Sequence, residues 1–227
     1  DAAFTDALLR IAPLNRPVQA ARLTQDQAMV EVATVPDRWE VARSYFVLGV
    51  EHILEGYDHL LFVIALVLLI GRTGAVIKAA SAFTVAHSIT LIGSTLGIVG
   101  LAQAPVEALV ALSIIFLAVE IVKRDPAHPS LTERLPWLVA FLFGLIHGFG
   151  FAGALREIGL PESDVPTALL TFNLGVEAGQ LVIVAAVMVL ITLTRRFAPR
   201  ALHPATLTAT YLIGTISSFW FIERIWP

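Results

Sequence analysis

Six apolar stretches that can cross a lipid bilayer fill most of this 227-residue sequence after residue 40. A membrane-spanning helix needs about 20 predominantly apolar residues. Hydrophobic residues make up 57% of the chain and charged residues 15%, and the mean hydropathy is +0.80. A soluble domain of this size could not keep so much apolar surface from water. The sequence predicts an all-α polytopic membrane protein with six transmembrane helices, at residues 44–70, 76–100, 106–122, 136–155, 166–194 and 205–223.

Lysine and arginine gather in every second connection between these segments. They follow the first, third and fifth segments, at Arg72, Lys78, Lys123, Arg124, Arg134, Arg195, Arg196 and Arg200. The connections after the second and fourth segments contain only Arg156. Because cytoplasmic loops carry an excess of positive charge, the pattern predicts that both termini lie outside the cell, N-out and C-out. Nothing in the charge distribution suggests a nucleic-acid partner.

Residues 1–40 differ from the rest of the chain. Apolar residues alternate with polar ones there, around Val18, Ala20 and Val30, and prolines interrupt the stretches. Such alternation favours β-strand. The sequence begins with Asp1 and has no signal peptide, so we expect residues 1–40 to be the tail of a larger extracytoplasmic β domain that precedes a membrane domain at 41–227. A flexible polar leader is the alternative.

Four histidines lie inside the predicted spans: His52 and His59 in the first, His87 in the second and His147 in the fourth. An ionisable side chain at the centre of a membrane helix costs about 2.5–3.5 kcal/mol on insertion scales. Side chains of this kind usually face the interior of the helix bundle and pair with one another. We therefore expect an intramembrane site.

The first span has a strongly polar face. At 100° per residue, five ionisable side chains fall within an arc of about 120° on a continuous helix: Glu51, His52, Glu55, Asp58 and His59. His52 and His59 would then lie about 10.5 Å apart along the axis, which is too far for easy binding of one ion by bonds of about 2 Å. Two positions along a path, or a break at Gly56, fit better. In the alternative interpretation, Glu51 and His52 stay in water at the interface.

Other spans contribute further polar groups. The second span carries Ser88 beside its histidine, and the fifth carries Asn173, Glu177 and Gln180 at i, i+4 and i+7. Each has a structural alternative, since a buried histidine can simply be hydrogen-bonded and Glu177 could join two helices through Gln180. We predict as metal ligands His52, Asp58, His59, His87, His147 and Glu177, with Glu51, Glu55, Ser88, Asn173 and Gln180 lining the site.

The available donor atoms limit the chemistry of this site. The chain contains no cysteine, which excludes thiolate metal sites, disulfides and cysteine nucleophiles. Imidazole and carboxylate groups remain, and they suit Ni²⁺, Co²⁺, Zn²⁺ or Fe²⁺. The sequence therefore predicts a divalent transition metal ion, nickel, cobalt or zinc, as the ligand, without identifying which one.

Four separated motifs resemble the HupE/UreJ family of nickel and cobalt permeases. Residues 52–59, HILEGYDH, follow the pattern H-x-x-x-G-x-D-H of that family's first helix. Residues 83–90 (FTVAHSIT), 143–152 (FGLIHGFGFA) and 172–180 (FNLGVEAGQ) look like the branch of the family with an extracytoplasmic domain before the membrane region. The resemblance covers about residues 38–223, and it implies a six-helix architecture and a bacterial inner-membrane location.

Two positions depart from the family pattern. The proline that follows the first histidine in typical permeases is Ile53 here. The acidic residue that ends the second family signature, H-G-x-A-x-G-x-E, is Ala154. Glu177 in the fifth span is the residue that could supply the missing carboxylate.

Three functions fit these residues. The first is a membrane permease for a divalent transition metal, which the ion would cross by way of the His/Asp/Glu site. The second is an intramembrane zinc-dependent metallohydrolase with the same ligands and with Asp58, Glu51 or Glu177 as general base. The third is a metal-sensing or assembly module that binds an ion without transport or chemistry. The expected partners are the metal ion and the lipid bilayer, and the sequence is compatible with a homo-oligomer.

Overall fold

The computed structural model describes residues 7–11, 19–23, 37–125, 127–158 and 164–226. The chain divides into two units, residues 1–37 and residues 38–227. In the first unit, strands β1 (Ala7–Ile11) and β2 (Gln19–Leu23) pair antiparallel, with Ala7 opposite Leu23. Most of the alternating sequence that predicted strands, including Val18 and Val30, falls outside the described residues. A two-stranded pair is too small to be a stable domain by itself, so the larger β domain stays a prediction.

The second unit is a bundle of helices: α1 (Arg38–Glu55), α2 (Tyr57–Ile70), α3 (Thr73–Thr95), α4 (Gln103–Val122), α5 (Leu131–Arg134), α6 (Pro136–Ile158), α7 (Val165–Phe197) and α8 (Pro199–Ile225). In the described part of the chain, α3, α4, α6, α7 and α8 are each long and apolar enough to cross a membrane. The pair α1 and α2 passes the same test together, which gives up to six spans. The protein is thus a multi-pass membrane protein with five or six spanning helices.

The first span is not one continuous helix, because it breaks at Gly56, which is one of the two possibilities that the sequence left open. Helices α1 and α2 meet there at an angle of 71°. Gly56 has φ −73° and ψ 96°, an extended conformation, and glycine has a weak preference for the helical state. The break leaves few backbone groups without partners, since the Gly56 N–H donates to the His52 carbonyl at 3.0 Å and the Leu60 N–H donates to the Gly56 carbonyl at 2.9 Å.

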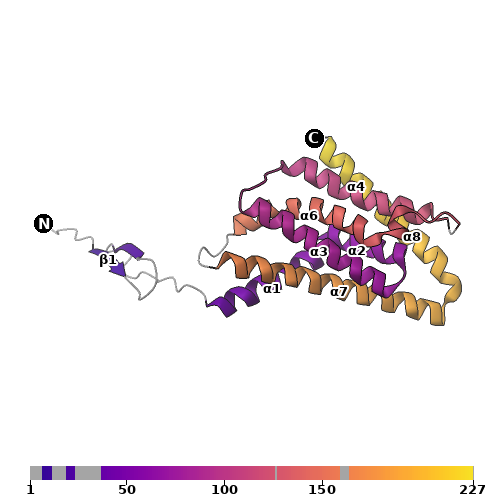
Figure 1. Ribbon diagram of the computed structural model, residues 1–227, viewed down its shortest axis with the longest axis horizontal. Coiled ribbons are helices and arrows are strands. Elements are labelled where there is room, and N and C mark those ends of the chain that lie inside the picture. The colour runs from indigo at the N-terminus through magenta and orange to yellow at the C-terminus, as the bar shows by residue number, and fades with distance from the viewer. Residues whose placement is uncertain (1–6, 12–18, 24–36, 126, 159–163, 227) are drawn as a thin grey trace. The chain divides into compact units, whose positions relative to one another are not determined.

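The longer helices pack in pairs, α3 along α6, α1 along α7 and α4 along α8 (Figure 1). Glycines allow the helix backbones to approach closely in two of these pairs, α3 with α6 and α1 with α7. An added Cβ at Gly144 of α6 would overlap the Phe83 carbonyl of α3, and one at Gly148 would overlap the His87 carbonyl. Between α1 and α7, a Cβ at Gly175 would overlap the Phe46 carbonyl. Small residues let membrane helices approach in this way, and the contact of α6 with α3 holds the histidine regions of both helices together.

Helix α2 is the most deeply buried of the helices that carry a histidine. Its buried apolar side chains include Phe62, Leu66 and Leu69, each 1% exposed, and it packs against α3, α4, α7 and α8. Residues 60–70 are apolar without exception. Beyond His59, α2 therefore offers no polar side chain.

Candidate metal site

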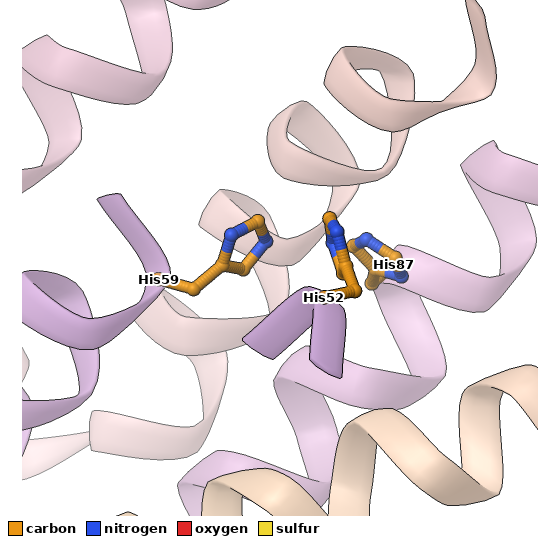
Figure 2. A group of neighbouring side chains, drawn as sticks. All are labelled: His52, His59 and His87. Atoms are coloured by element: carbon orange, nitrogen blue, oxygen red, sulfur yellow. The ribbon is translucent and has the colours of Figure 1, made fainter. Parts of the chain in front are cut away.

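Three histidines from three helices meet at the break between α1 and α2. One ring nitrogen from each of His52, His59 and His87 lies within 4.8 Å of the other two. The three rings turn toward one another (Figure 2). His52 comes from the last turn of α1, His59 from the first turn of α2 and His87 from the middle of α3. Bonds of about 2 Å in a tetrahedral site put nitrogens roughly 3.4 Å apart, so small side-chain adjustments would bring all three onto one ion.

The break at Gly56 is what makes this meeting possible. On a continuous helix, His52 and His59 would be about 10.5 Å apart along the axis. Across the bend their ring centroids are 4.6 Å apart. The seven-residue spacing of His52 and His59 left two possibilities, two separate positions along a path or a break at Gly56. The structure has the break.

Asp58 orients the ring of His59. Its Oδ1 accepts a hydrogen bond from the backbone N–H of His59 at 2.8 Å and lies 2.9 Å from His59 Nδ1. A carboxylate accepts hydrogen bonds only, so Nδ1 carries the hydrogen and Nε2 keeps its lone pair. This carboxylate–histidine arrangement is the one that typically supports a metal-binding imidazole. Asp58, predicted as a ligand, therefore contacts the site through His59.

Asn173 of α7 plays the same part for His87. Its Oδ1 lies 3.4 Å from His87 Nδ1, and its side-chain nitrogen donates to the Leu169 carbonyl at 2.7 Å. Because the amide nitrogen is already used as a donor, the amide oxygen faces the imidazole as an acceptor. His87 then donates from Nδ1 and keeps a lone pair on Nε2. His87 is fully buried.

His147 of α6 lies beside the group. Its ring centroid is 5.2 Å from that of His59, and the residue is 1% exposed. Its Nε2 lies 3.1 Å from the hydroxyl of Ser113 in α4, and that hydroxyl donates its hydrogen to the Val110 carbonyl at 2.6 Å. Ser113 thus accepts from His147, which leaves the lone pair on Nδ1. Ser113 could not be predicted from the sequence, since one hydroxyl in an apolar helix carries no distinctive signal.

Each of the four membrane histidines has one buried ring nitrogen that is left without a hydrogen-bond partner. In the described part of the chain, four buried imidazole nitrogens have no hydrogen-bond partner: His52 Nε2, His59 Nε2, His87 Nε2 and His147 Nδ1. For His59, His87 and His147 these are the atoms that the hydrogen bonds above leave as acceptors. A buried polar atom without a partner costs about 1–3 kcal/mol. A divalent cation would supply a partner to the three histidines of the group, His52, His59 and His87. The donor set fits a first-row transition metal.

Aromatic rings surround this group of histidines. The rings of Phe151 and His52 have centroids 3.9 Å apart, and Phe151 stacks on Phe172 at 5.3 Å. Phe83 lies 5.0 Å from the His147 ring. Such an apolar shell excludes water, which strengthens the interaction between an ion and its ligands.

The other predicted site residues lie farther out. Glu177 accepts a hydrogen bond from Ser81 at 2.6 Å, and Gln180 accepts one from Thr84 at 3.0 Å, so both connect α7 to α3. Ser88 donates to its own helix, to the Thr84 carbonyl at 2.7 Å. The ligand role predicted for Glu177 stays a prediction.

Glu51 and Glu55 are exposed on α1 and do not join the three-histidine group. The bend separates both residues from the face of Asp58 and His59, which lie in α2. The single polar face was drawn for one continuous helix, and at Gly56 that helical register ends.

Comparison with known proteins gives one assignment. Residues 25–224 match the family model described as HupE / UreJ protein. No curated protein and no solved structure matches the chain. The matched residues include the whole three-histidine group and the helices that carry it, which confirms the resemblance of the four sequence motifs. The chain belongs to the HupE/UreJ family.

Proposed function

We propose that this protein is a permease for a divalent transition metal ion, with Ni²⁺ or Co²⁺ as the first candidates and Zn²⁺ as the next. The observation that carries the proposal is the set of four buried ring nitrogens, on four helices, that have no partner in the described residues. Membership of a family related to nickel and cobalt permeases supports it.

The exposure of the histidines suggests the order of events. His52 is only partly buried, whereas His59, His87 and His147 are 5%, 0% and 1% exposed. The ion would lose water first at His52 and then be held by the deeper rings. Ligand nitrogens must be deprotonated to bind a metal. Protons therefore compete with the ion, and acidification on one side would favour release.

We place the protein in a bacterial inner membrane with both termini extracytoplasmic. The distribution of lysine and arginine among the connections supports this orientation. In it, the Thr73 end of α3 is cytoplasmic, and His87, the fifteenth of its 23 residues, lies in the outer half. Residues 1–40 would belong to an extracytoplasmic domain.

One observation favours the zinc-dependent hydrolase as a second candidate. A cavity of about 460 Å³ lies between α3 and α7, lined by Ser88, Ile92, Leu169 and Asn173 among others. It is apolar and reaches Asn173, the partner of His87. A lipid chain could enter there beside a metal-bound water.

Transport by purified protein in sealed vesicles tests the proposal. Ni²⁺ or Co²⁺ is supplied outside, and a fluorescent indicator inside reports its arrival. We expect His59→Ala and His87→Ala to abolish accumulation, because a dehydrated ion at these buried positions has no water to replace a lost ligand. His52→Ala should mainly raise the concentration needed for half-maximal uptake.

Another histidine of the chain provides a control for the histidine substitutions. His203 is an exposed histidine outside the group, and His203→Ala should transport like the wild type. If wild-type protein binds the ion tightly but moves none across the bilayer under an imposed gradient, the permease proposal fails and the hydrolase becomes the favoured function.

A further inference from the structure

Three hydrogen bonds join α3 to α7, at levels that are successive along α3 but not along α7, where Glu177 lies between Asn173 and Gln180. His87 bonds Asn173 at 3.4 Å, Thr84 donates to Gln180 at 3.0 Å, and Ser81 donates to Glu177 at 2.6 Å. On α3 these levels are three residues apart, which is about 4.5 Å of helix rise. We call these six residues the α3–α7 seam. It begins at the three-histidine group and runs toward the Thr73 end of α3.

The α3–α7 seam carries polar side chains away from the three-histidine group, whereas α2 does not. From residue 60 to residue 70, α2 has only apolar side chains. An ion that left the histidines along α2 would meet no ligand, and a bare cation in hydrocarbon is prohibitively unstable. His87 belongs both to the three-histidine group and to the seam, so an ion held by the group already touches the first level.

Glu177 is the acidic member of the seam. It lies about three turns into a long apolar helix, is only partly buried, and accepts a hydrogen bond from the Ser81 hydroxyl at Oε1. Among the described residues, no lysine or arginine forms an ion pair with it. An acidic residue at membrane depth without a cationic partner is costly and indicates a functional site.

We propose that the α3–α7 seam is the inner half of the ion pathway and that Glu177 is a second station for the divalent cation, beside its partner Ser81, which lies about 9 Å along α3 from His87. This inference rests on the proposed permease function. The station would offer a carboxylate, the Ser81 hydroxyl and the Gln180 amide oxygen. Oxygen donors hold late first-row ions less strongly than imidazole does, so the station receives the ion from the histidines and releases it.

Two measurements on the same variants test the inference. Bound Co²⁺ reports on the histidine site through its visible absorption spectrum in detergent, and Co²⁺ entry into sealed vesicles reports on transport. Glu177→Gln keeps the shape of the side chain and an acceptor for Ser81 while it removes the charge. We expect its Co²⁺ spectrum and stoichiometry to match the wild type, and its initial transport rate to fall by about tenfold or more. Gln180→Leu should lower the rate in the same way.

Ser81→Ala is compared with Thr192→Ala as its control. Ser81 donates into the seam, whereas Thr192, exposed on α7, donates to the Met188 carbonyl of its own helix. Ser81→Ala should slow transport, and Thr192→Ala should leave it unchanged. If Glu177→Gln transports at the wild-type rate, the station does not exist. If it loses the Co²⁺ spectrum of the histidine site, Glu177 belongs to that site and the inference is overturned. Absence of transport in the wild type would instead remove the permease function itself.

Discussion

Asp58 fixes the ring of the residue that follows it, His59. A single carboxylate oxygen, Oδ1, accepts the backbone N–H of His59 and lies 2.9 Å from its Nδ1. The two contacts close a short loop in the first turn of α2, immediately after the break at Gly56. The direction in which His59 presents Nε2 is thus set by its neighbour in sequence.

Asp58→Asn is expected to weaken binding of Ni²⁺ or Co²⁺ by about 10–100-fold, the usual cost of removing a partner of a metal-bound histidine. The amide retains an acceptor but loses the charge that raises the basicity of the ring. Titration calorimetry in detergent measures the affinity. Glu223→Gln, which neutralises an exposed acid on α8, is the control and should bind like the wild type. Equal affinity for Asp58→Asn would show that His59 needs no carboxylate.

Gly56→Ala should disturb the three-histidine group. The new Cβ would lie 2.6 Å from the His52 carbonyl oxygen and 3.0 Å from His59 Nδ1. Alanine also favours the helical state by about 1 kcal/mol over glycine, which works against the break that brings His52 to His59. We expect the affinity for Co²⁺ to fall by about tenfold or more and its absorption spectrum to change.

Gly74→Ala is the matched control for Gly56→Ala. Gly74 lies in the first turn of α3, and a Cβ there would meet nothing within 4 Å. The control should bind Co²⁺ normally. An unchanged spectrum in Gly56→Ala would mean that the bend does not depend on glycine.

The sequence predicted the helical membrane class and the family, because apolar segments of bilayer length and motifs in order are visible without a structure. It also predicted an intramembrane group of histidines, and His52 and His59 of the predicted first span lie close to His87 of the second. The physical reason is the cost of polar groups in hydrocarbon, which leaves few other places for them. Their role as metal ligands stays a prediction.

Features that depend on a helix bend or on helix packing could not be predicted from the sequence. A helix wheel assumes a continuous helix, so it assigned Glu51 and Glu55 to the face of His59. The break at Gly56 was one of two options, and sequence spacing could not choose between them. The sequence did not mark Ser113 as a site residue, since its importance comes only from its position opposite His147.

Gly148→Ala should lower the thermal stability of the protein. A Cβ at this position of α6 would overlap both the His87 carbonyl and the Thr90 hydroxyl of α3. Overpacking of this kind typically costs about 1–3 kcal/mol. Gly93→Ala, in α3, is the control, because its Cβ would meet nothing within 4 Å. Unfolding followed by tryptophan fluorescence should show a lower midpoint for Gly148→Ala alone, and equal midpoints would contradict the close approach of α3 and α6.

Ser113→Ala tests whether His147 acts together with the other three histidines. Without the hydroxyl, His147 Nε2 loses its acceptor at a position that is 1% exposed, and a buried donor without a partner costs about 1–3 kcal/mol. The ring can then move its hydrogen to Nδ1, which removes the lone pair that faces the site. We expect Ni²⁺ or Co²⁺ to bind about tenfold more weakly. Ser113→Thr, which retains a hydroxyl, should restore the affinity.

A double-mutant cycle separates this role of Ser113 from simple packing. If Ser113 acts through His147, then Ser113→Ala should not weaken metal binding further in a His147→Ala background, since the two effects share one pathway. Calorimetric affinities of the four proteins complete the cycle. Additive losses from the two substitutions would mean that Ser113 supports the site by another route, and no loss in either single variant would exclude His147 from the ligand set.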